Sequence, residues 1–330
     1  MKITAALHSP AQTVAAATIG VAMLLSVAAC GTSDATDTSA SAGASGSSSA
    51  STQGFDVSAV AKDDAIAALV PDSVKSDGKL TVGMDTSYAP AEFLDDSQKP
   101  VGYDVDLAKA LGKVMGLETE PVTSTFDSIL PSIGSKYDIG ISSFTITDER
   151  KEAVDFVSYY KAGSTWAVKK GNPEKFDSSN LCGLKIAVQT GTTQEEEVNT
   201  ANDACPADKK IEVLSSKLQT DVTTNVVTGK AVAFYADSPV AGYAISQTGG
   251  KLEAFGEDVG VATQGVAIKK GDSQMDEAVQ KAVTKLMEDG TYGKILEQWC
   301  DVRFHRQVRD QPRRRLTGEI RHSGRMFLSS

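Results

Sequence analysis

The chain has 330 residues, of which 41% are hydrophobic, so it can bury the core of one large domain or of two smaller ones. This composition excludes a fibre and a disordered chain. The formal net charge of −10 disfavours nucleic acid as a partner, because phosphate binding requires a field of basic side chains.

The first 29 residues have the features of an export signal: a lysine, an apolar run and then small residues. The stretch VAAC, residues 27–30, resembles the lipobox of bacterial lipoproteins, whose cysteine is lipidated and becomes the first mature residue. This resemblance implies a signal peptide over residues 1–29 and a lipid anchor at Cys30 that holds the protein on the cell membrane. An ordinary signal peptide cut near the same place, or an uncleaved anchor, is the alternative.

A low-complexity segment follows Cys30. Residues 31–54 consist almost entirely of Ser, Ala, Gly, Thr and Asp and contain no large apolar side chain. Such a segment cannot offset its chain entropy by burial, so we expect a flexible tether over residues 30–54. Residues 55–76 are then an N-terminal extension of the folded body.

Short β-rich runs alternate with helical patterns from residue 79 onward. The pattern predicts strands over residues 79–85, 137–144, 184–191, 231–237 and 264–270, and helices over residues 104–115, 148–156 and 273–290. The last helix has Ser273 as its expected N-cap and Gly290 as its expected stop. This alternation predicts an α/β fold with mostly parallel sheets.

Three further cysteines follow Cys30. Cys182 and Cys205 enclose a loop of about two dozen residues, and a disulfide between them contributes on the order of 3 kcal/mol in an oxidising compartment. No histidine lies near either cysteine, so a zinc site is the weaker interpretation. Cys300 has no evident partner.

The end of the chain, residues 300–330, differs abruptly in composition from the rest. Eight of the nine arginines lie in it, and residues 301–330 carry a net charge of +5 against −15 for residues 1–300. A basic tail that contacts anionic lipid or a partner is one interpretation. We favour an aberrant or disordered segment, such as a foreign or frame-shifted end.

Polar residues stand where the predicted strands end: Asp85, Ser143, Thr145, Gly191 and Asp237. Ligands of open α/β sheets bind at the carboxyl ends of the strands. A site built from strands so far apart in the chain requires two lobes that face each other.

Four motifs resemble one family in the same order: GYDVDLAKALGKVM (102–115), TITDERKEAVDF (145–156), QTGTTQE (189–195) and GTYGKILEQW (290–299). They are similar to the bacterial extracellular solute-binding proteins of family 3, which deliver amino acids to ABC importers. The resemblance covers roughly residues 77–299. It implies a periplasmic-binding-protein-like fold of type II, with two crossovers joining lobe one (77–166 and 261–299) to lobe two (167–260).

Arg150 is the single arginine in the first 300 residues, and a guanidinium binds a planar carboxylate through two parallel N–H donors where lysine offers a point charge. The resemblance implies that Arg150 and Thr145 hold the ligand's carboxylate. It further implies that Asp237, with the Ser143 carbonyl, holds the ammonium from the other lobe. The alternative for Asp237 is a helix N-cap.

Six remaining residues are assigned to the second lobe's carboxylate contacts or to the ligand's side chain. Thr192 and Thr193 resemble the lobe-two carboxylate contacts of the family, although a turn followed by a helix cap has the same pattern. Asp85 with the aromatic walls Tyr88 and Phe126 resembles the basic-amino-acid binders and suits a cationic chain. Gln189 is expected to tune the selectivity for the ligand's side chain in either direction. From these residues together we expect a polar amino acid, with a basic one favoured.

The expected partners are a small amino acid, the transmembrane permease subunits and the membrane, and the expected state is a monomer without cofactor, metal or catalytic residues. Two other functions compete with transport. One is an amino-acid sensor that signals to a separate chain. The other is a dehydratase-like enzyme, which would need proton transfer from carboxylates, because residues 9–300 contain no histidine.

Overall fold

A computed structural model describes residues 53–299 of the chain. The expected signal peptide, the lipidation of Cys30, most of the tether, Cys300 and the arginine-rich end lie outside the described residues. Among residues 53–299, no helix combines the length and the apolar character needed to cross a membrane.

The described residues form eleven strands and twelve helical segments. The strands are β1 (Lys79–Met84), β2 (Ser87–Tyr88), β3 (Glu92–Leu94), β4 (Pro100–Val101), β5 (Glu118–Thr123), β6 (Ile139–Thr145), β7 (Val154–Lys169), β8 (Lys185–Gln189), β9 (Glu212–Ser216), β10 (Ala233–Asp237) and β11 (Leu252–Lys269). The helices are η1 (Val57–Ala59), α1 (Asp64–Leu69), α2 (Asp72–Lys75), α3 (Tyr103–Met115), α4 (Phe126–Ile129), η2 (Leu130–Ser132), α5 (Asp148–Ala153), α6 (Thr193–Ala204), α7 (Gln219–Thr228), α8 (Ser238–Gln247), α9 (Ser273–Glu288) and α10 (Thr291–Trp299).

Eight strands form one sheet in the order β5-β1-β6-β11-β7-β10-β8-β9, and β2, β3 and β4 form a small second sheet. We call β5, β1 and β6 the β1 half, and β10, β8 and β9 the β8 half. Pairing within each half is parallel, whereas β7 and β11 pair antiparallel with each other and with their neighbours.

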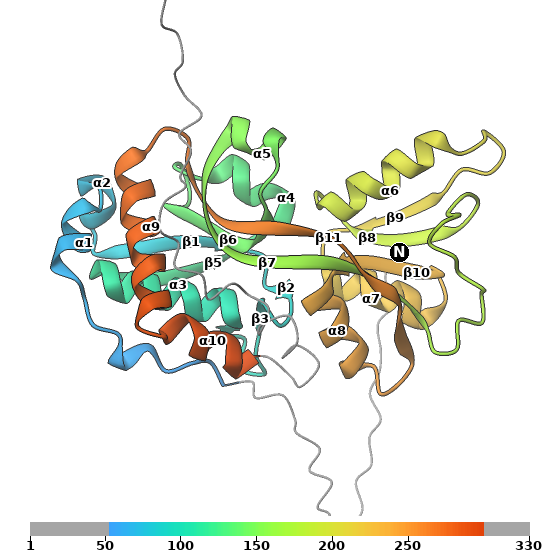
Figure 1. The fold of residues 1–330 in the computed structure, drawn as a ribbon, viewed down its shortest axis with the longest axis horizontal. Coiled ribbons are helices and arrows are strands. Elements are labelled where there is room, and N and C mark those ends of the chain that lie inside the picture. The colour runs from blue at the N-terminus through green and yellow to red at the C-terminus, as the bar shows by residue number, and fades with distance from the viewer. Residues whose placement is uncertain (1–52, 300–330) are drawn as a thin grey trace, which may run out of the picture. The chain divides into compact units, whose positions relative to one another are not determined.

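The long strands β7 and β11 connect the two halves and run side by side over most of their length (Figure 1). Their pairing extends from Leu252 opposite Lys169 to Lys269 opposite Val154, with register shifts between. Two crossovers between halves of parallel strands are the connection of a type II two-lobe fold. The fold class expected from the sequence is therefore confirmed.

Helix α3 shows how the motif 102–115 determines local structure. Gly102 has φ of 130°, and a Cβ there would lie 2.1 Å from the Ala91 carbonyl oxygen, so the helix starts at a position that requires glycine. Gly116 ends the helix in the left-handed conformation. Nearly every residue between them is buried, because α3 packs against β5 on one side and α9 and α10 on the others.

The β8 half has an apolar cluster of its own around Trp166 and Tyr235, whose rings stack with centroids 4.1 Å apart. Cys182 and Cys205 form a disulfide at the edge of this cluster, with Cα atoms 5.5 Å apart. The pairing expected from the sequence is confirmed, and it ties the loop before β8 to the end of α6.

Three local predictions were wrong. The helix expected over residues 148–156 ends at Ala153, and Val154 begins β7. Asp272, not Ser273, caps α9, because its carboxylate accepts a hydrogen bond from the Met275 N–H while Ser273 is already helical. The strand expected over residues 264–270 is only the end of β11, which starts at Leu252. The first part of β11 is largely exposed and contains glycines, so its sequence lacks the apolar pattern of a strand.

Candidate functional site

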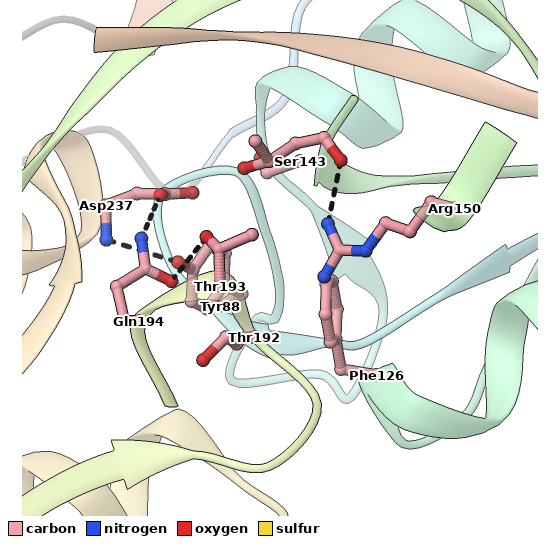
Figure 2. Close-up of a pocket in the computed structure, with 9 residues that line it drawn as sticks. Tyr88, Phe126, Ser143, Arg150, Thr192, Thr193, Gln194 and Asp237 are labelled. Carbon is pink, nitrogen blue, oxygen red and sulfur yellow. Dashed lines mark hydrogen bonds between the residues drawn. The ribbon is translucent and has the colours of Figure 1, made fainter. Parts of the chain in front are cut away.

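A small cavity lies where the β1 half meets the β8 half, next to the crossover strands (Figure 2). Its lining comes from the ends of strands and the starts of helices, as expected for an open α/β sheet. The lining residues are Tyr88, Phe126, Ser143, Thr145, Arg150, Thr192, Thr193, Gln194 and Asp237. The structure thus brings together all of the predicted ligand-binding residues except Asp85 and Gln189.

Arg150 reaches the cavity from the short helix α5, which begins directly after β6. The Thr147 hydroxyl caps this helix by accepting from the Arg150 N–H at 3.1 Å. The guanidinium donates from Nη1 to the Thr145 carbonyl at 2.8 Å and from Nη2 to the Gly191 carbonyl at 2.9 Å. It also lies 5.4 Å from the centroid of the Phe126 ring.

The guanidinium is therefore fixed in position but not neutralised. Within residues 53–299 no carboxylate lies within 4.0 Å of it. Burial lowers the pKa of Arg150 from its ordinary value, while the charge of Asp237 acts in the opposite direction. An arginine stays protonated despite such a shift, so the cavity contains a cation that can bind an anion.

Asp237 ends β10 and stands at the N-cap position of α8, but its side chain makes no capping hydrogen bond. Its Oδ1 accepts from Gln194 Nε2 and its Oδ2 from Gln264 Nε2, each at 2.8 Å. Its backbone N–H donates to the Tyr88 hydroxyl at 3.3 Å. The capping alternative is therefore not realised.

The carboxylate of Asp237 is 93% buried without a cationic partner in the described part of the chain. Burial raises its pKa to about 6, although the two amides, the Tyr88 hydroxyl and the charge of Arg150 favour the ionised form. A ligand ammonium would supply the missing positive charge. Tyr88 beside it has a pKa raised well above its ordinary value by burial, so it acts as a neutral wall.

Thr192 and Thr193 lie at the start of α6. The Thr192 hydroxyl accepts from the Glu195 N–H and donates to the Gln189 carbonyl, which fixes the cap. Gly191 before it has φ of 82°, and a Cβ there would meet the Asp127 Cβ at 2.9 Å. The turn can therefore approach the β1 half closely, and the first residues of α6 line the cavity.

Asp85 and Gln189 do not line the cavity; they are hydrogen-bonded to each other beside it. Gln189 Nε2 donates to Asp85 Oδ2 at 2.6 Å, and Ser87 donates to Oδ1 from both its N–H and its hydroxyl. The Phe126 N–H donates to Oδ2 as well, at 3.2 Å. If Asp85 is to face the distal end of a ligand, as expected from the sequence, the Gln189–Asp85 hydrogen bond must break, or Asp85 must accept from the ligand and from Gln189 at the same time.

Sequence reasoning missed Gln194 and Gln264, the two amides that hold Asp237. Gln194 was visible in the motif QTGTTQE, one residue beyond the two threonines, but nothing distinguished it from an exposed helical residue. Gln264 lies in β11, in the crossover, where no sequence pattern indicates a site. Both side chains are nearly fully buried.

The cavity is suited to bind a zwitterion. A fixed guanidinium on the β1 half and an anionic carboxylate on the β8 half line the same space, as Figure 2 shows. Among residues 53–299, no group of three or more His, Cys, Asp or Glu side chains is arranged to hold a metal ion. The lining residues offer a ligand hydrogen-bond donors, hydrogen-bond acceptors and two opposite charges.

Known proteins are similar to this chain in both sequence and fold. The arginine-binding protein ArgT of Corynebacterium glutamicum is 35% identical over 238 residues, which cover 71% of this chain and 78% of that protein. The solved structure of an ancestral arginine-binding protein bound to arginine has a TM-score of 0.64 and 35% identity and covers 68% of this chain and 99% of its own. The ancestral amino acid-binding protein AncCDT-1, a precursor of cyclohexadienyl dehydratase, has a TM-score of 0.64 and 36% identity over 70% of this chain and 99% of its own.

The model of the bacterial extracellular solute-binding proteins, family 3, matches residues 80–302, which is more than half of the chain. The four motifs, the two crossovers and the cavity between the two halves all fall within that range. The chain belongs to this family of bacterial extracellular solute-binding proteins.

Proposed function

We propose that this chain is the substrate-binding protein of an ABC importer and that it captures an L-amino acid with a basic side chain outside the cytoplasm. The observation that supports this most directly is the pair of unmatched opposite charges, Arg150 and Asp237, in one cavity. The α-carboxylate of the ligand binds Arg150 and Thr145, and its α-ammonium binds Asp237 and the Ser143 carbonyl. Thr192 and Thr193 assist at the carboxylate.

The ligand is then the main link between the two lobes. We propose lobe one over residues 77–166 and 261–299 and lobe two over 167–260, with β7 and β11 as the connections. Arg150 belongs to the first and Asp237 to the second, so a zwitterion gains its full set of contacts only when the lobes close on it. Closure is therefore a population shift driven by contacts of the closed state.

The side chain of the ligand extends between Tyr88 and Phe126 toward Asp85. Two aromatic faces and a carboxylate attract a guanidinium or an ammonium. Burial raises the pKa of Asp85, while four hydrogen bonds from Ser87, Phe126 and Gln189 favour its ionised form. ArgT and the ancestral arginine-binding protein carry arginine in their names, which supports a basic ligand.

The N-terminal segment supports a location for the protein outside the cytoplasm, at the cell membrane. We propose that residues 1–29 direct export, that Cys30 is lipidated and that the tether to residue 54 lets a monomer work close to the membrane. There it passes its ligand to the transmembrane subunits of the importer. A sensor that uses the same site differs from this only in its partner chain.

An enzyme on the same fold is the second candidate, and one observation favours it: the similarity to AncCDT-1, a precursor of a dehydratase. We propose binding without turnover, because the buried carboxylate of the cavity and the one beside it already accept hydrogen bonds. Asp237 is held by two amides and Asp85 by four donors. The similar proteins described above are themselves named for binding.

The test is isothermal titration calorimetry with L-arginine and three matched analogues. Agmatine lacks the carboxylate, Nα-acetyl-L-arginine lacks the ammonium, and L-citrulline lacks the side-chain charge. L-Arginine should bind with micromolar or tighter affinity, agmatine and the acetyl derivative should bind at least about a hundredfold more weakly, and citrulline should be intermediate. Equal affinity for agmatine would refute the role of Arg150, and recovery of a chemically altered ligand would favour the enzyme.

A further inference from the structure

Two carboxyl groups lie buried directly behind the cavity, and the binding mechanism above does not use them. Glu92 belongs to β3 and Asp104 to the first turn of α3, and both are fully buried. Neither lies within 4.0 Å of a lysine or arginine of the described residues. Two ionised carboxylates without a cation would be very costly in such a place.

The hydrogen bonds around Asp104 are those of an ionised carboxylate. Its Oδ2 accepts from the Ser143 N–H at 2.8 Å and from the Ser143 hydroxyl at 3.0 Å, and its Oδ1 accepts from the Tyr159 hydroxyl at 2.6 Å. Three donors therefore point at this group, and the Glu92 carboxyl lies beside it. Burial raises the pKa of Asp104 to about 6, and the Tyr159 hydrogen bond is the largest effect in the opposite direction.

The surroundings of Glu92 are those of a protonated acid. Its Oε1 accepts from the Ser142 hydroxyl at 2.5 Å, and that hydroxyl accepts in turn from the Asp85 N–H. Its Oε2 is buried and has no hydrogen-bond partner among residues 53–299, so an ionised oxygen there would be left without a donor. Burial and then the charge of Asp104 raise the pKa of Glu92 well above its ordinary value. The other titratable groups that interact with the two carboxyls are Asp85, Tyr88, Tyr103 and Tyr159.

Asp104 matters to the cavity because of the shape of β6. Gly265 of β11 pairs with Phe144, but Ala267 pairs with Gly140, so β6 bulges between Gly140 and Phe144. Within this bulge Ser143 has φ of 49°, a left-handed conformation that is strained for a serine. Bulges of this kind re-aim residues beside binding sites, and here the freed Ser143 N–H is satisfied by Asp104.

We propose that Glu92 and Asp104 form an acid pair that keeps one proton on Glu92, and that ionised Asp104 is a positioning residue that holds Ser143 in the cavity wall. The negative charge of Asp104 also favours a cation on the other side of Ser143. This inference rests on the proposed function, because it assigns Asp104 to the ammonium end of the same site.

The first experiment does not require a ligand. Infrared spectra of the full chain in D₂O at pH 8 separate a protonated carboxylic acid from the carboxylates. The parent should show one protonated-acid band, which Glu92→Gln removes and Asp106→Asn retains. Asp106 is the matched control. It is as buried as Asp104 and lies on the same helix, α3, but its carboxylate accepts hydrogen bonds from the Phe55 N–H and from Trp299 Nε1. Absence of the band, or its persistence in Glu92→Gln, would overturn the acid pair.

The second experiment measures L-arginine affinity against pH. Tyr159→Phe deletes one hydrogen bond to Asp104 and leaves the cavity lining intact, so the pH at which affinity is lost on acidification should rise by about one unit. An unmoved profile would overturn the positioning role. Asp104→Asn should weaken binding at pH 7.5 by about tenfold or more relative to Asp106→Asn, and equal affinities would also overturn it.

These outcomes separate the inference from the function on which it rests. If the parent binds no amino acid, the proposed function fails while the infrared band still decides the acid pair. If L-arginine binds and Tyr159→Phe behaves as the parent, the function stands and the positioning role fails. Should Asp104→Asn not fold, the conservative Tyr159→Phe variant carries the test.

Discussion

Replacing Arg150 by lysine keeps the positive charge but removes the fork of donors. The arginine spans two backbone carbonyls, Thr145 at 2.8 Å from Nη1 and Gly191 at 2.9 Å from Nη2, one in each half of the sheet. A single ammonium cannot reach both and also donate twice to a ligand carboxylate. The variant therefore loses about two charge-assisted hydrogen bonds in the ligand-bound state.

The expected magnitude follows from these two bonds. Allowing for water that replaces part of each bond, their loss amounts to about 2 kcal/mol, or roughly thirtyfold in affinity. The dissociation rate should rise more than the association rate falls, because the affected contacts form on closure.

Calorimetry with L-arginine gives the affinity, and stopped-flow tryptophan fluorescence gives the two rates. Lys151→Gln is the matched control, since Lys151 is the adjacent cation of α5, is exposed and pairs with Asp148 outside the cavity. Its affinity should stay within about twofold of the parent. If Arg150→Lys binds within threefold of the parent, the guanidinium is not the carboxylate clamp.

Three further outcomes are expected. Burial raises the pKa of Asp237 to about 6, and a ligand ammonium needs the ionised form of this carboxylate. The affinity for L-arginine should therefore be constant above pH 7 and fall by up to tenfold per pH unit below pH 6. Calorimetry that finds no such fall would contradict the role of Asp237 at the ammonium. Removing the disulfide with Cys182→Ser and Cys205→Ser should cost about 3 kcal/mol and lower the Tm by about 6–12 °C in calorimetric scans, with unchanged affinity as the control; an unchanged Tm would contradict the loop-closure account. Cys30→Ser should move the protein from the membrane fraction to the medium in a fractionated culture of a lipoprotein-processing host, whereas retention on the membrane would refute the lipid anchor.

Patterns along the chain were enough to predict the fold class and most of the cavity. The lone Arg150, and the strand ends Ser143, Thr145 and Asp237, were predicted to lie together, and all four line the cavity. The α/β elements could be predicted because apolar periodicity and turn residues act over a few neighbouring positions, whereas the two crossovers and the roles of the site residues came from the resemblance of the four motifs to the family. The disulfide followed from spacing and composition in the same way.

Only the tertiary structure decided which side chains donate hydrogen bonds to the buried carboxylates. Asp237 is bonded to Gln194 and Gln264, at separations of 43 and 27 residues, and Asp85 to Gln189 at a separation of 104. A glutamine has the same appearance in a sequence whether it is exposed or buried, and its partner depends on how β7 and β11 bring the two halves together. The bulge that turns Ser143 toward Asp104 likewise arises from the pairing of β6 with β11, because register between distant strands is set by packing and not by either strand's own residues.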